Sequence, residues 1–134
     1  MLIENHTTRL SESLEMIQYA VTHGPQHPQR TLGFHLSAAA VDLLNLYLHK
    51  EGFTTSSEDI NHRWLRSAKK TKEKIPFDFP KKTKLLSLIQ AIEDVRDPFC
   101  YGVPRAVEEI ERTLILFRDL LELFRRLGID EAQF

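Results

Sequence analysis

Apolar residues recur along most of the chain at spacings of three and four, and clusters of proline and glycine separate the runs. This spacing predicts amphipathic helices rather than strands, whose apolar residues alternate. The breaks fall at Gly24-Pro25 and Pro28, at Gly52, at Pro76 and Pro80, at Pro98, Gly102 and Pro104, and at Gly128. The pattern therefore predicts an all-α fold.

We expect five helical segments. The first covers about 8–23 and the second about 31–51. The third starts near Ser57, where Thr55 with Glu58 or Ser56 with Asp59 could form a capping box, and it frays into the lysines that follow. The fourth runs from Pro80 to Asp97, because Pro98 biases the residue before it away from helical geometry. The fifth runs from Pro104 and is closed by Gly128.

Two of these segments carry more apolar surface than one packing face needs. The centre of the second, AAAVDLLNLYL, is apolar almost all round, which suits the middle of a bundle or a subunit interface. The fifth has one stripe from Val107 to Phe124 and a second at Leu116, Leu120, Leu123 and Leu127. We therefore expect a homodimer, with a compact bundle that wraps both faces as the alternative.

Composition favours one soluble domain over residues 1–134. The apolar share is 42% and the charged share 28%, as in globular proteins. The single cysteine, Cys100, allows no internal disulfide, which fits a reducing compartment. The N-terminal stretch is polar, and no apolar run reaches the roughly 18–20 residues of a membrane span. We predict a cytoplasmic protein without a membrane interaction.

Positive charge is concentrated in one stretch of a chain whose net charge is −1. Residues 62–84 contain nine lysines and arginines against Glu73 and Asp78, a net charge of +7 that leaves −8 on the remainder. Such asymmetry marks either a surface for phosphate or an acidic partner, or a solvated edge whose lysines serve solubility.

Most familiar catalytic patterns are missing from the sequence. One cysteine and no H-E-x-x-H argue against zinc, so we predict no metal site and no cofactor. The Gly24-Pro25 break also argues against a helical pair of His23 and His27. What remains is the segment from Arg96 to Gly102, where a guanidinium, a carboxylate and a phenol meet at one inter-helix corner. Arginine binds phosphate bidentately and tyrosine stacks on bases, although both residues could also simply cap the turn.

Around this corner the sequence resembles the HEPN family (higher eukaryotes and prokaryotes nucleotide-binding domains). The resemblance covers about residues 10–127 and rests on three stretches that occur in order: RTLGFHLSAAAVDLLNLYLHKEGF, INHRWLRSAKK and LIQAIEDVRDPFCYGVPRAVEEIERTLILFRDLLELF. It implies an antiparallel bundle of four main helices plus a short helix, usually dimeric. Many HEPN members are metal-independent ribonucleases or toxins of toxin–antitoxin pairs with an R-x4–6-H motif. Others bind nucleotides or pair with a small nucleotidyltransferase.

The resemblance places the family's arginine at Arg96 and its following polar position at Asp97, while Tyr101 stands where the motif has histidine. Cleavage through the 2′-hydroxyl needs a base that titrates near neutrality, as histidine does at about 6.5. An unperturbed tyrosine, with a pKa of about 10, is ionised in only about one molecule per thousand at pH 7. In a dimer, His35 or His62 could substitute for the missing histidine, but nothing in the sequence places them there.

The resemblance therefore predicts a non-catalytic HEPN-like module that binds a nucleotide, RNA or a partner protein such as a small nucleotidyltransferase. The candidate binding residues are Arg96, Asp97, Tyr101, His62, Lys69 and Lys70. The alternative is a metal-independent endoribonuclease, with Arg96 and Tyr101 as its candidate catalytic residues.

Overall fold

The structure, a computed structural model, describes residues 1–23 and 28–134. Its elements are α1 (Ile3–Thr22), α2 (Gln29–Lys50), the short 3-10 turn η1 (Trp64–Arg66), α3 (Ala68–Lys74), α4 (Lys82–Tyr101) and α5 (Val107–Arg126). No strand occurs in these described ranges, which confirms the all-α prediction. The predicted break at Gly24-Pro25, and with it His27, lies outside the described residues.

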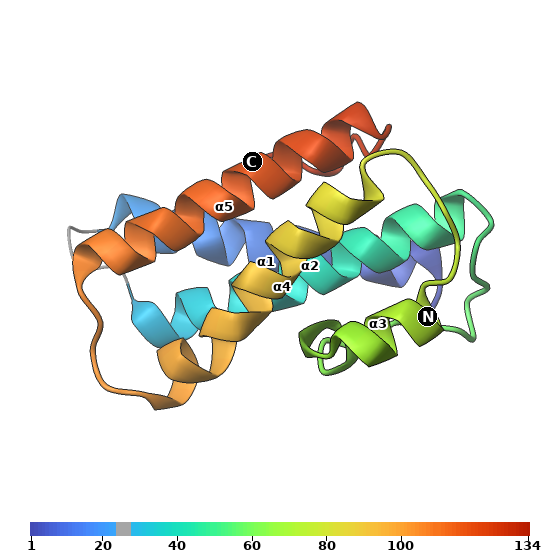
Figure 1. Cartoon of the computed structure of the whole chain (residues 1–134). Coiled ribbons are helices and arrows are strands. Elements are labelled where there is room, and N and C mark those ends of the chain that lie inside the picture. The colour runs from blue at the N-terminus through green and yellow to red at the C-terminus, as the bar shows by residue number, and fades with distance from the viewer. Residues whose placement is uncertain (24–27) are drawn as a thin grey trace.

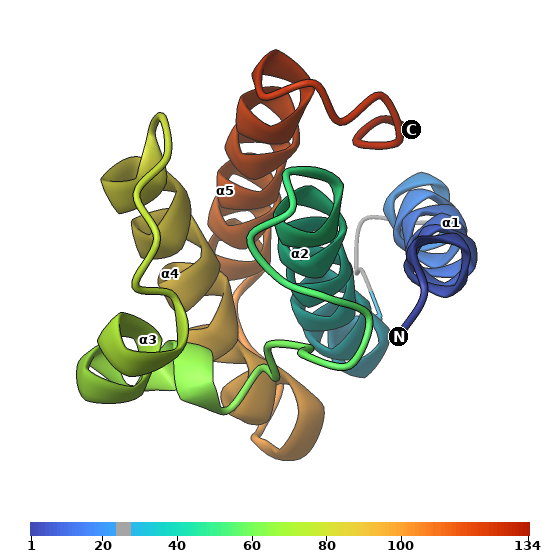
Figure 2. The ribbon, with the colours of Figure 1, turned by 90° about the vertical axis from the view of Figure 1, so that its right-hand side faces the viewer.

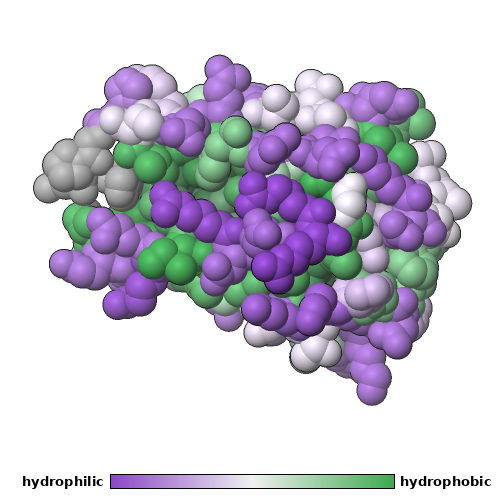
Figure 3. Space-filling model, turned by 90° about the horizontal axis from the view of Figure 1, so that it is seen from above, coloured by the Kyte–Doolittle hydropathy of each residue, from purple (hydrophilic) through white to green (hydrophobic). Residues whose placement is uncertain are grey.

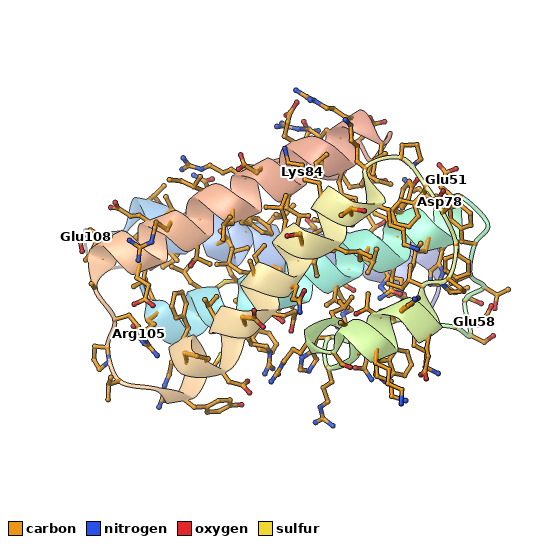
Figure 4. All side chains as sticks on the ribbon, viewed as in Figure 1. Glu51, Glu58, Asp78, Lys84, Arg105 and Glu108 are labelled. Carbon is orange, nitrogen blue, oxygen red and sulfur yellow. The ribbon has the colours of Figure 1, made fainter. Side chains whose placement is uncertain are left out.

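The four long helices form a bundle around α2. Each of α2, α4 and α5 runs opposite to the long helix before it (Figure 1). Seen along the bundle, α1 lies on one side of α2, and α4 and α5 lie on the other (Figure 2). The short helix α3 lies beside α4, away from α1 (Figure 2). Charged side chains such as Glu51, Lys84 and Glu108 are exposed and point away from the bundle (Figure 4).

Helix α2 is apolar almost all round because it forms the middle of the bundle. Its residues from Leu43 to Leu48 are all buried. By length and composition α2 could cross a membrane, but 72% of the relevant window is buried inside the fold. Its composition is thus explained by packing, as in the core helix of a soluble protein.

Both apolar stripes of α5 pack within the chain. Leu120 and Leu123 of the second stripe are buried, and Leu116 and Leu127 pack against the core in part. The face over α5 is mainly hydrophilic, with smaller hydrophobic patches between the polar side chains (Figure 3). Packing within the chain therefore accounts for both stripes of this helix, and the homodimer stays a prediction.

The ends of α5 follow the expected chemistry. Glu108 and Glu109 lie in its first turn, and Arg125 and Arg126 lie in its last, so the charges complement the helix dipole. Gly128 has φ +93°, the left-handed conformation of a helix C-terminal cap. The helix begins at Val107 rather than at Pro104.

The predicted third helix is wrong in its position. Thr55 and Glu58 do bond to each other, with the Thr55 N–H 3.0 Å from Glu58 Oε1, but they close a turn and no helix follows. The cause is a contact distant in sequence: Asn45, buried on α2, accepts from the Ile60 N–H at 2.7 Å and donates to its carbonyl at 2.9 Å. That pairing uses the backbone groups a helix would need. Helix α3 instead forms at the lysines, and the Ser67 hydroxyl caps it.

Helix α4 continues through Pro98 and ends at Tyr101, so the predicted end at Asp97 is also wrong. Proline removes one backbone hydrogen bond from a helix interior. Here the next residue, Phe99, is buried against α2, and this packing favours the continued helix. Tyr101 is consequently the last helical residue, not part of the following turn.

Candidate functional site

A cavity of about 540 Å³ lies between the second half of α4 and the segment around η1. We call it the arginine cleft. Its lining is almost entirely polar and consists of His62, Arg63, Arg66, Arg96, Asp97 and Tyr101.

Four of the six predicted binding residues meet in this cleft: His62, Arg96, Asp97 and Tyr101. Lys69 and Lys70 do not line it; both are exposed on α3. Two lining residues, Arg63 and Arg66, were not predicted. The cleft exists because the Asn45–Ile60 pairing directs the segment after residue 60 past α4, and the turn η1 then presents Arg66.

Asp97 links the two segments that form the cleft, helix α4 and the turn η1. Its carboxylate accepts from Arg66 at 2.8 Å and from Arg96 at 3.1 Å. The hydrogen bond from Arg66 is the main cause that lowers the pKa of Asp97, and Arg96 adds to it. The carboxylate is therefore ionised at neutral pH and holds two guanidinium groups side by side.

Arg96 is well fixed for a long side chain. It is only 16% exposed, and its guanidinium carbon lies 5.9 Å from the ring centre of Phe34. The contact with Phe34 is a cation–π arrangement that leaves the N–H groups free to bond elsewhere. Tyr101 is 75% exposed at the rim of the cleft, so its ring is accessible.

Behind the cleft, His62 faces a buried carboxylate. Nδ1 of His62 lies 3.4 Å from Oε2 of Glu93, whose side chain is fully buried. The hydroxyl of Ser37 donates to the other oxygen of Glu93 at 2.5 Å. Within the described chain, His62 Nδ1 and Glu93 Oε2 are buried without a well-aligned hydrogen bond. Nδ1 is thus the ring nitrogen that faces Glu93, and Nε2 is the one left for a ligand in the cleft that His62 lines.

The charges around these two groups set their protonation. Burial lowers the pKa of His62, and the positive charges of Arg96, Arg66 and Arg63 lower it further. Burial raises the pKa of Glu93, against the opposing effects of Ser37 and the arginines. His62 is thus a neutral imidazole at pH 7, with Nε2 available as an acceptor if Nδ1 carries the proton toward Glu93.

The buried, ionised carboxylate of Glu93 destabilises the folded state at neutral pH. We therefore expect Glu93→Gln to increase the free energy of unfolding by roughly 1–2 kcal/mol at pH 7.5. Since burial in the folded state raises the pKa of Glu93 from its ordinary value of 4.5, Glu93 favours folding while it is protonated, below that value. That contribution is lost as the pH rises through the folded pKa. The glutamine keeps the bond with Ser37 and carries no charge. Urea unfolding at pH 7.5 and pH 5 measures the difference, which should shrink at the lower pH.

The exposed Glu111→Gln on α5 is the matched control and should change stability little at either pH. A loss of stability in Glu93→Gln at pH 7.5 would show that the ionised carboxylate is favourable where it stands.

Sequence reasoning missed Glu93, although a signal was present. Glu93 follows Leu85 and Ile89 at intervals of four, on the buried stripe of α4. A carboxylate in a core stripe is uncommon and marks a functional candidate. Arg63 and Arg66 gave no comparable signal, because a basic stretch alone does not show which of its side chains converge.

The cleft is suited to anions rather than to a metal, because arginines dominate its lining and Asp97 already pairs with two of them. Comparisons with protein families, with curated proteins and with solved structures found no match to this chain.

Proposed function

We propose that this protein is a nucleotide- or RNA-binding domain of the cytoplasm that holds phosphate groups in the arginine cleft. The observation that carries the proposal is the convergence of three arginines on one cavity with a single exposed carboxylate among them. The positive charge left over attracts an anion.

The geometry favours phosphate over other anions. Arg66 and Arg96 are held side by side by Asp97, and planar guanidinium groups match the oxygens of a phosphate. The accessible ring of Tyr101 offers a stacking surface for a base next to that phosphate. Lys69 and Lys70 on α3 could extend the basic surface along a longer RNA.

Replacing Arg96 by alanine should weaken binding of a fluorescein-labelled single-stranded RNA by about 10–100-fold, because one charge-assisted phosphate contact is lost. Fluorescence anisotropy at several salt concentrations measures the affinity and its salt dependence. Arg112→Ala, an exposed arginine on α5 away from the cleft, removes the same charge and should bind as the wild type does. Equal affinity in both variants would reject the arginine cleft as the binding site.

A second candidate, RNA cleavage, is favoured by one specific observation: His62 lines the same cleft as Arg96. The fold thus places a histidine beside Tyr101, which stands at the position where the HEPN motif has its histidine. Neutral His62 could take the proton of a 2′-hydroxyl, whose oxygen then attacks the adjacent phosphorus and displaces the 5′-oxygen. Arg96 and Arg66 would stabilise the charge on phosphorus, and the Tyr101 hydroxyl could protonate the leaving oxygen. Labelled RNA left intact by the protein in EDTA would reject this candidate.

The homodimer and the nucleotidyltransferase partner implied by the HEPN resemblance stay predictions. Neither is needed for the cleft, which is formed within one chain.

A further inference from the structure

A second polar cluster lies at the C-terminal end of α2, and the end of α4 packs near the other end of that helix. Helices α1 and α2 are antiparallel, so the start of α1 and the end of α2 meet. His6 comes from the first helix, His49 from the last turn of the second, and Asp59 from the loop between α2 and η1. The N-terminus of the chain lies beside this loop (Figure 2).

The three side chains converge on one point. Nε2 of His6 lies 3.1 Å from Oδ1 of Asp59, and Nε2 of His49 lies 3.0 Å from the same oxygen. The three potential ligand atoms are all within 4.8 Å of one another. In a tetrahedral zinc site with bonds of about 2.0–2.1 Å, neighbouring ligand atoms are about 3.3 Å apart. The two distances to Oδ1 of Asp59 need a few tenths of an ångström of expansion to admit an ion, and the two Nε2 atoms, which lie within 4.8 Å of each other, adjust by rotation of the side chains.

The other ring nitrogen, Nδ1, of each histidine contacts an oxygen atom of a neighbouring side chain. Nδ1 of His6 is 2.8 Å from the buried carboxylate of Asp42, and Nδ1 of His49 is 2.6 Å from the hydroxyl of Thr54. Histidines that bind metals are commonly oriented this way, by a carboxylate or another oxygen at the second ring nitrogen. Both imidazoles are nearly inaccessible, with 3% and 4% of the side chain exposed, whereas Asp59 is 35% exposed.

We propose that His6, His49 and Asp59 bind a divalent transition-metal ion, with Zn²⁺ as the best fit, through two Nε2 atoms and one carboxylate oxygen. Two imidazoles and one carboxylate suit zinc and its neighbours in the first transition row, and they do not suit Mg²⁺ or Ca²⁺, which require mostly oxygen ligands. Asp59 is partly exposed, and its other oxygen lies 3.0 Å from the amino group of Met1, which a water molecule serving as the fourth ligand would have to displace.

No histidine spacing in the sequence indicated this set, because its members lie on three separate segments. The prediction of no metal site was based on motifs, and motifs report only ligands that are near one another in the chain.

The ion would tie α1, α2 and the loop after α2 together. Asp59 directly precedes Ile60, which Asn45 holds, and His62 of the arginine cleft follows two residues later. Metal binding is therefore expected to stabilise the segment that delivers His62, although the metal site and the cleft are separate. Protons compete for the same atoms, since metal-bound histidine must be neutral.

Isothermal titration of the metal-free, tag-free protein with Zn²⁺ tests the proposal, together with the visible absorption of bound Co²⁺. We expect one saturable site, tetrahedral Co²⁺ bands, and a Tm increase of about 10 °C at a free Zn²⁺ concentration of 100 times the Kd. Mg²⁺ should produce none of these effects.

Two conservative variants decide whether these ligands are responsible. His49→Gln and Asp59→Asn should each abolish the Co²⁺ bands and weaken Zn²⁺ binding at least 100-fold, while circular dichroism shows the helices intact. Should His49→Gln fail to fold, Asp59→Asn alone decides the question, because its amide keeps most of the hydrogen bonding. His23→Gln, an exposed histidine at the end of α1, is the control and should bind normally. No saturable site in the wild type, or unchanged binding in folded Asp59→Asn, would overturn the proposal.

Discussion

Replacing Gly33 by alanine is expected to destabilise the protein by about 1–3 kcal/mol and to lower its Tm by several degrees. A Cβ atom at Gly33 would lie 2.6 Å from Cβ of Phe99, 3.2 Å from Sγ of Cys100 and 3.3 Å from the carbonyl oxygen of Arg96. A Cβ–Cβ distance of 2.6 Å is not possible without movement of the helix backbone. Helices α2 and α4 can cross this closely only because Gly33 has no side chain.

The sign of this effect makes it informative. Helix propensity alone predicts that Gly→Ala within a helix stabilises by about 1 kcal/mol. The close crossing predicts the opposite, and a still larger loss for Gly33→Val. Because Arg96 and Asp97 lie on the part of α4 that would move, RNA affinity should fall as well. Thermal unfolding and anisotropy on the same samples measure both effects. A rise in Tm for Gly33→Ala would mean that α2 and α4 do not cross this closely.

If the protein cleaves RNA, His62→Gln should reduce the rate at least about 100-fold, the usual contribution of a general base. Glutamine keeps the size and polarity of the side chain but cannot accept and release a proton near pH 7. RNA affinity should change much less, because the arginines that contact phosphate remain. The comparison therefore separates catalysis from binding.

The dependence on pH follows from the direction of the pKa shift. The pKa of His62 is lowered from 6.5, so the neutral, basic form already dominates at pH 7. Cleavage should be nearly constant above pH 7 and should decline only when the pH falls below 6.5. Single-turnover rates in EDTA between pH 5 and 8 measure this profile, with His23→Gln as the control. A rate that survives in His62→Gln would exclude His62 as the base.

The parts of the fold that the sequence predicted well are those governed by local periodicity. The long apolar runs identified α2, and the charge order with Gly128 identified the end of α5. The errors arose where a contact distant in sequence outweighed a local preference. Packing of Phe99 against Gly33 carries α4 through Pro98, and Asn45 keeps the Ile60 backbone out of a helix.

The candidate site was predictable in part for the same reason. Arg96, Asp97 and Tyr101 are close in sequence, so the corner could be recognised as a unit. The position of His62 beside it depends on the Asn45–Ile60 pairing, which no local pattern shows. The buried carboxylate of Glu93 accepts a hydrogen bond from Ser37 on α2. This contact joins two helices and so cannot be read from a local pattern either.

The binding site itself is located most directly by NMR titration of isotope-labelled protein with AMP and with a short single-stranded RNA. Our account predicts that the largest perturbations fall on the side-chain Nε–H signals of Arg63, Arg66 and Arg96 and on the backbone amides near His62 and Tyr101. Signals from α5, such as the side chain of Arg112, should move little. Perturbations concentrated on α5, or none at saturating ligand, would contradict the claim that the arginine cleft binds phosphate.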